Sequence, residues 1–226
     1  MSTGAGATPT GTQVVLRPLA TPLPLGFLAL ALATTVFSAV QLGWVPPEEG
    51  RVAGYTALFA TVPLQLLASV FGFLSRDPVA ATGMGVLSGT WAVAGLTTLS
   101  TRPGQVSPGL GTLLLVGAAA MLVPAAAAVS SKVVPAAVMA LAATRFAVTG
   151  IYELTGSAAW KTTAGWVGVV LAVLAIYAAL ALELEGARER TVIPVGRRGA
   201  GRSAMAGDGP LDPGDLIREA GVRPQL

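Results

Sequence analysis

An arginine in the middle of an apolar stretch is the residue of this chain best suited to bind an anion. Arg145 lies near the centre of residues 133–154, far from the charges at either end. A guanidinium presents a planar fork of N–H donors that matches the two oxygens of a carboxylate. On a helix, Ala142, Thr149 and Tyr152 lie on nearly the same face. The pattern indicates a carboxylate-binding position, and its alternative is a structural arginine that binds helix ends or backbone carbonyls.

Two further polar side chains lie inside apolar stretches. Glu153 is a candidate partner for a proton or for Arg145. Eight residues of helix would separate the two side chains by about 12 Å along the axis and about 80° around it, so an ion pair within one helix is unfavourable. Gln65 is the only amide in residues 52–74. It predicts either a hydrogen bond between helices or a polar group that lines a path.

A third pattern, T-P-L-P-L-G over residues 21–26, opens the first apolar stretch. We expect Pro22 and Pro24, after Thr21, to keep a short segment out of helical conformation, and Gly26 to allow a close approach. Non-helical backbone at membrane depth is tolerated where it is buried in protein or lines a cavity. The helix start beyond it would offer free N–H groups and a positive dipole end to a carboxylate. The alternative is an ordinary helix that proline starts at the membrane surface.

The composition argues against several classes of function. The chain has no histidine and no cysteine, and its apolar stretches hold no paired carboxylates. Its glycine-rich runs lack the strand–turn–helix context of a phosphate-binding loop. We therefore expect no enzyme, no metal and no cofactor. The net charge is +3, and the C-terminal tail begins with a basic run at Arg197, Arg198 and Arg202, which indicates membrane topology and not nucleic-acid binding.

The overall composition predicts an all-α protein of the lipid bilayer. The 226 residues are 53% hydrophobic and 11% charged, whereas soluble domains carry about 25% charged residues. Residues 164–182 contain no charge, and as a helix they would span about 29 Å, close to the hydrocarbon thickness of a bilayer. Six such stretches are expected to cross the membrane: 23–45, 52–74, 79–99, 110–129, 133–154 and 163–184.

The stretches divide the chain into a mobile N-terminal tail (1–20), a six-helix transmembrane domain (21–196) and a disordered C-terminal tail (197–226). An even number of spans puts both termini on one side. Eight basic residues fall on that side: Arg17, Arg76, Lys132, Arg188, Arg190, Arg197, Arg198 and Arg202. Three fall on the other: Arg51, Arg102 and Lys161. The positive-inside bias predicts a multi-pass protein of the cell membrane with both termini in the cytoplasm.

Two parts of the chain resemble a known family. T-P-L-P-L-G-F at residues 21–27 is similar to the N-P-A-P-L-G-L signature of the YaaH-type acetate uptake transporters, the family of the succinate–acetate permeases. A-G-W-V-G at 164–168, I-Y at 176–177 and R-T-V-I-P-V-G at 190–196 resemble that family's A-G-W-I-G, I-Y and R-T-V-L-P-I-G at matching spacing. The resemblance runs from about residue 18 to residue 196 and describes a divergent member.

The resemblance implies a six-helix subunit around its own central path, assembled as a homo-hexamer. Such proteins carry acetate and related small carboxylates, succinate among them, often with protons. By ungapped offset, the family's constriction of Phe, Tyr and Leu falls on Leu30, Leu87 and Ala142, which makes the constriction aliphatic. Together with the patterns above, the expected substrate path comprises Thr21, Pro22, Pro24, Gly26, Leu30, Gln65, Leu87, Ala142 and Arg145.

Departures from the family's pattern leave two alternatives open. Thr21 replaces the family's Asn, and Trp91 alone survives from its F-x-S-Y-G-x-F-W run. An aliphatic constriction also suits a channel for a small neutral solute such as urea, whereas Arg145 favours a carboxylate. The other alternative is a non-transporting membrane protein on the same scaffold. Trp91, Trp160 and Trp166 are interpreted as packing or interfacial residues.

Overall fold

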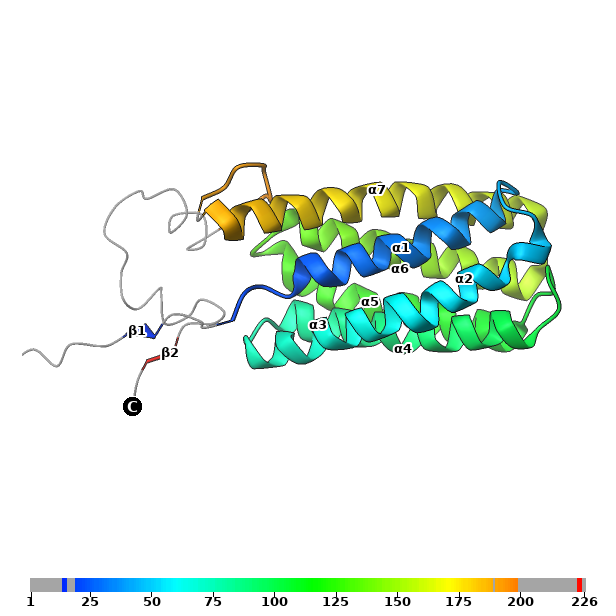
Figure 1. Cartoon of the computed structure of the whole chain (residues 1–226), viewed down its shortest axis with the longest axis horizontal. Helices are drawn as coiled ribbons and strands as arrows, with labels where there is room; N and C mark the ends of the chain where they lie inside the picture. The colour runs from blue at the N-terminus through cyan, green and yellow to red at the C-terminus, as the bar shows by residue number, and fades with distance from the viewer. Residues whose placement is uncertain (1–13, 16–18, 189, 199–222, 225–226) are drawn as a thin grey trace, which may run out of the picture.

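The protein is a bundle of helices lying side by side along its long axis (Figure 1). The computed structural model describes residues 14–15, 19–188, 190–198 and 223–224. Within these residues, six helical spans are long and apolar enough to cross a membrane. They are α1 (Leu23–Gln41), α2–η2–α3 (Arg51–Leu74), α4 (Pro78–Ser100), α5 (Pro108–Val129), α6 (Val133–Thr155) and α7 (Ala158–Arg188). The predicted all-α membrane fold is therefore confirmed.

Two short elements lie outside these spans. A 3-10 turn, η1 (Pro47–Glu49), follows α1. A two-residue antiparallel pair joins β1 (Val14–Val15) to β2 (Arg223–Pro224). Most of the two expected tails, 1–20 and 197–226, lies outside the described residues.

Local sequence sets the ends of several helices. The Asp77 carboxylate accepts the Ala80 N–H at 3.0 Å and caps α4, and the Ser107 hydroxyl accepts the Leu110 N–H at 3.3 Å and caps α5. Proline follows each cap, where its missing N–H would have no partner in any case. Gly156 ends α6 at a φ of 65°, a left-handed conformation that glycine adopts without strain.

The second span changes its helical form in the middle. α2 (Arg51–Tyr55) leads into a π-helical segment, η2 (Thr56–Thr61), and then into α3 (Val62–Leu74). Pro63, at the start of α3, has no N–H and its ring clashes with the carbonyl one turn earlier. The wider π turns relieve that clash, and the span continues through the proline.

The last helix differs from its predicted range. α7 begins at Ala158, whereas the sequence predicted a span from 163 after a loop. Residues 158–162 contain neither glycine nor proline, so nothing in them stops the helix. Lys161 consequently lies in the first turns of α7 and faces a cavity described below.

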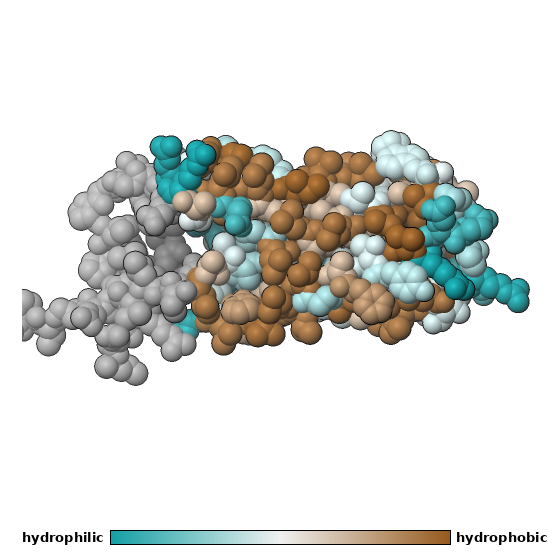
Figure 2. Space-filling view, in the orientation of Figure 1, coloured by the Kyte–Doolittle hydropathy of each residue, from teal (hydrophilic) through white to brown (hydrophobic). Residues whose placement is uncertain are grey.

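Three helices form the inside of the bundle. The apolar windows of α1, α4 and α6 are 56%, 61% and 56% buried, against 33%, 39% and 44% for the other three spans. These inner helices are the first, third and fifth spans, so they run in the same direction (Figure 1). The face shown in Figure 2 has a broad apolar band with hydrophilic residues near its ends. Such a band suits contact with lipid or with other apolar helices.

Residues 191–198, the strap, fold back onto the bundle after α7. Val195 is fully buried, and the Val133 N–H donates to the Gly196 carbonyl at 3.0 Å. Arg197 donates to the buried Glu185 carboxylate through Nε at 2.9 Å and also through Nη2. The strap therefore ties the end of α7 to the start of α6. Its contacts reach Arg198, whose N–H donates to the Ser131 carbonyl, two residues past the expected boundary at Gly196.

We predict that removal of residues 199–226 leaves assembly and thermal stability unchanged, because the chain would keep all described contacts of the strap. Glu185→Gln should instead lower the free energy of unfolding by about 1.5–3 kcal/mol, because it weakens charged hydrogen bonds at a buried position. Thermal unfolding in detergent measures both. Glu183→Gln, at an exposed position on the same helix, is the control. Loss of assembly on truncation, or equal losses for the two glutamates, would contradict the prediction.

Candidate functional site

Two adjacent cavities enter the bundle from the end formed by the α1–α2, α4–α5 and α6–α7 connections. The outer cavity has a volume of about 110 Å³ and the inner one about 60 Å³. Phe37, Gln41, Thr98 and Glu153 line both, so they form the neck between the two. Together the cavities make a polar recess that reaches from one end of the bundle toward its middle.

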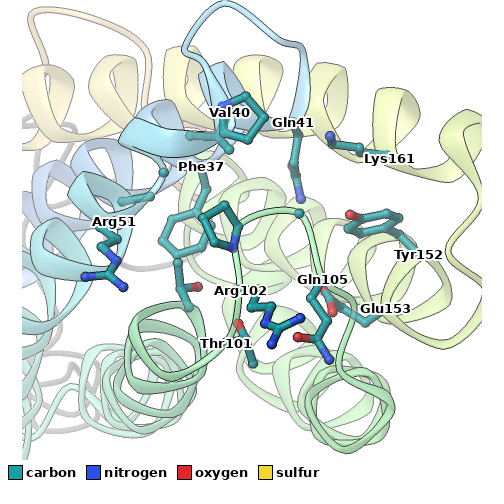
Figure 3. Close-up of a pocket in the computed structure, with 16 residues that line it drawn as sticks. Phe37, Val40, Gln41, Arg51, Thr101, Arg102, Gln105, Tyr152, Glu153 and Lys161 are labelled. Carbon is teal, nitrogen blue, oxygen red and sulfur yellow. The ribbon is translucent and has the colours of Figure 1, made fainter.

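The outer cavity carries an excess of positive charge. Arg51 comes from the start of α2, Arg102 from the α4–α5 connection and Lys161 from α7 (Figure 3). Glu153 is the one carboxylate among its lining residues. A recess whose charged lining residues are mainly cations raises the local concentration of anions. In the sequence these three cations indicate only membrane topology. Their spacing does not reveal that the fold brings three separate segments together.

Arg145 lines the inner cavity and is 3% exposed. Its Nη1 donates to the Ala164 carbonyl of α7. This bond matches the structural alternative of the sequence analysis, in which the arginine binds a backbone carbonyl. A guanidinium has five N–H donors, and the described residues provide this one acceptor. The remaining donors stay available on a side chain that borders a cavity.

Two glycines let neighbouring residues pack closely against α7. A Cβ at Gly168 would overlap the Ser38 hydroxyl and would lie 2.8 Å from Arg145 Nε. Gly165, one turn earlier, packs in the same way against Leu42 of the α1 end. The A-G-W-V-G run thus has a packing role, because its glycines admit α1 and the Arg145 side chain to the surface of α7.

Glu153 does not pair with Arg145, in line with the separation expected for two residues eight apart on one helix. Its carboxylate accepts the Ser107 N–H at 2.7 Å and so ties α6 to the start of α5. No ion pair joins it to Arg145 in the described part of the chain. The separation of the two residues along α6 and around its axis accounts for this. Glu153 instead contributes a carboxylate to the neck (Figure 3).

The expected constriction lies on the three inner helices. Leu30 of α1, Leu87 of α4 and Ala142 of α6 are fully buried and belong to one hydrophobic core. Leu87 and Ala142 each stand one helical turn before an inner-cavity residue, Trp91 on α4 and Phe146 on α6. These three residues, the aliphatic layer, are buried in the core, and none of them lines the inner cavity.

The opening motif is helical, so the expected non-helical segment is wrong. α1 begins at Leu23, with Pro22 as its N-cap and Pro24 in its first turn. Both prolines fit there because the first N–H groups of a helix have no partner within it. The expected close approach at Gly26 is confirmed, since a Cβ there would overlap the Met84 side chain of α4.

Gln65 reaches this motif from α3. Its Nε2 lies 3.5 Å from the Gly26 carbonyl, at the limit of a hydrogen bond between helices. Its Oε1 is buried without a partner in the described structure, as is the Thr21 hydroxyl. The structure thus brings Gln65 and Gly26 together, while Arg145 lies farther along the bundle, beyond the aliphatic layer.

The fold and the recess define a multi-pass membrane protein with a polar path that enters the bundle from one end. The model of the GPR1/FUN34/yaaH family matches residues 4–195. The chain therefore belongs to this family, which confirms the resemblance drawn from its motifs. A search of curated proteins gives no match.

A solved structure of the bacterial acetate channel SatP has the same fold. The TM-score is 0.69 at 23% sequence identity, and the match covers 79% of this chain and 99% of that one. The likeness extends over the whole six-helix bundle.

We predict that Gly168→Ala destabilises the protein, because the added methyl group must displace Ser38 and Arg145. Overpacking of this kind costs about 1–3 kcal/mol. Gly186→Ala on the same helix is the control, since a Cβ there meets no atom within 4 Å. It should leave stability equal or slightly higher, as alanine favours a helix. Thermal unfolding in detergent compares the two, and equal behaviour would contradict the packing role of Gly168.

Proposed function

We propose that this protein is a membrane channel or transporter for acetate and related small carboxylates. The observation that carries the proposal is the sequence of cations along the recess, from Arg51, Arg102 and Lys161 in the outer cavity to Arg145 in the inner one. Membership of the GPR1/FUN34/yaaH family supports it. So does the fold shared with the acetate channel SatP.

In this proposal the outer cavity collects anions from solution. A carboxylate then passes the neck and meets the Arg145 guanidinium, whose charge offsets the loss of hydration. The layer of Leu30, Leu87 and Ala142 must open before the solute can continue. An aliphatic layer disfavours a hydrated ion and accepts the methyl end of acetate. Protonation lowers the free-energy cost for a carboxylate to cross this apolar layer. The proposal therefore includes proton coupling.

The two alternatives are weaker on the same residues. Urea has no charge, so a channel for it gains nothing from the buried Arg145 or from the basic outer cavity. In a non-transporting protein, the recess and the charged side chains that line it would have no function. The buried residues that border the recess contain no pattern typical of an enzyme.

The finer features of the proposal concern assembly and orientation. We infer a homo-hexamer in the cell membrane, with both termini in the cytoplasm. The apolar outer surface supports contacts with neighbouring subunits and lipid (Figure 2). The distribution of basic residues supports the orientation. The recess then opens to the outside.

Uptake into liposomes tests the proposed function. Purified protein should admit radiolabelled acetate faster than protein-free liposomes do, and an inward proton gradient should increase the rate. Succinate and urea serve as a larger carboxylate and a neutral solute. Urea uptake without acetate uptake would reject the proposal in favour of a neutral-solute channel.

We predict that Arg145→Gln folds and assembles but loses carboxylate uptake, while any passage of urea survives. Glutamine retains much of the volume but lacks the charge. Arg188→Gln, at the exposed end of α7, should transport normally. Unchanged acetate uptake in a well-folded Arg145→Gln protein would reject the role. Failure to assemble would favour the structural alternative.

We predict that a cysteine at Glu48 is labelled by an impermeant thiol reagent from outside intact cells, and that a cysteine at Ser130 is not. Both positions are exposed, at opposite ends of the bundle. The chain has no native cysteine, so each label reports one site. If only the Ser130→Cys protein is labelled, the orientation in the membrane is the reverse of the one proposed.

A further inference from the structure

A layer of three aromatic rings holds Trp91 in the inner cavity. The Trp91 ring lies 5.2 Å from Phe37 of α1 and 6.4 Å from Phe146 of α6, between ring centroids. The second pair is edge-to-face, a favoured arrangement of aromatic rings. One ring comes from each of the three inner helices, so the position of the indole is fixed by the bundle itself.

The indole N–H of Trp91 has no partner. The residue is 5% exposed, and its Nε1 is buried without an acceptor in the described structure. A buried donor left unpaired costs about 1–3 kcal/mol, and such groups are rare in folded proteins. Phenylalanine would fill most of this space without leaving a donor unpaired. A ligand that reaches Nε1 from the adjacent cavity would supply the missing acceptor.

Arg145 supplies more donors to the same cavity. Both residues line it, and Arg145 directly precedes Phe146, which packs on the Trp91 ring. Indole and guanidinium groups donate hydrogen bonds and accept none. Two such groups beside one cavity suit a ligand rich in acceptors. A carboxylate, with two oxygens and about four lone-pair sites, is such a ligand.

The cavity has the size of a small carboxylate. Its volume is about 60 Å³, and one water-sized group needs about 10–15 Å³, so about four to six such groups fit. Acetate has four heavy atoms. Phe37, Leu114 and Phe146 provide apolar surface for its methyl group.

We propose that Trp91 Nε1 donates a hydrogen bond to a small monocarboxylate held by Arg145 in the inner cavity. This assignment rests on the proposed function and names a substrate-binding residue of the same path. Trp91 is then a specificity residue and more than a packing residue. Its ring positions the donor, and Arg145 provides the charge.

Trp91→Phe is the direct test, since it retains a ring in the aromatic layer and removes the N–H. Loss of a hydrogen bond to a charged group should raise the KM for acetate uptake about 10-fold or more, with a smaller effect on the maximal rate. Trp160→Phe, at a position 39% exposed on α7, should leave both constants unchanged. An unchanged KM in Trp91→Phe would overturn the proposal.

Equilibrium binding provides a second test that does not need transport. In a protein with Trp44, Trp160 and Trp166 replaced by Phe, Trp91 is the remaining tryptophan. Acetate should change its emission in a saturable way, and urea should not. The absence of an acetate-dependent change in emission would overturn the proposal. This test remains valid if Trp91→Phe fails to fold. If the wild-type protein takes up no carboxylate, the proposed function fails, while this binding measurement still decides the role of Trp91.

Discussion

The burial of one guanidinium inside an apolar bundle is the constraint on which much of the structure depends. A charge at the centre of a membrane helix costs about 2.5–3.5 kcal/mol on insertion scales, so Arg145 must contact protein or water. It does so by donating to the Ala164 carbonyl. That bond requires α7 to pass close to α6, which Gly168 permits. The same side chain gives the inner cavity its polarity, so packing and site chemistry rest on one contact.

Three inner helices that run in the same direction arrange the path in layers. The aliphatic layer, with Leu30, is followed outward by the aromatic layer around Trp91 and then by the neck with Glu153. Each layer takes one or more residues from α1, α4 and α6, because equivalent turns of parallel helices lie at equal depth. Charged groups, hydrogen-bond donors and apolar residues thus follow one another from the end of the bundle toward its middle. At the opposite end, the strap and the Glu185–Arg197 pair fasten the bundle.

The sequence by itself determined the class of fold and the number of membrane spans. Apolar stretches of bilayer length, separated by prolines, glycines and charges, predicted six helices and most of their boundaries. The anomaly of Arg145 was also local, since a charge near the middle of 133–154 must contact protein or water wherever the helix lies. The motif at 190–196 indicated the family. These features depend on length, composition and short-range order, which a chain carries before it folds.

The tertiary structure alone decided which groups meet. It paired Glu153 with the Ser107 N–H and gathered Arg102 with two other cations around one cavity. It made the opening motif helical, and it left the Trp91 N–H without a partner beside Arg145. The physical reason is that these helices are apolar on nearly every face. Their sequence therefore does not mark the rotation of each helix about its axis or its depth in the bundle, and those two variables determine which side chains line the path.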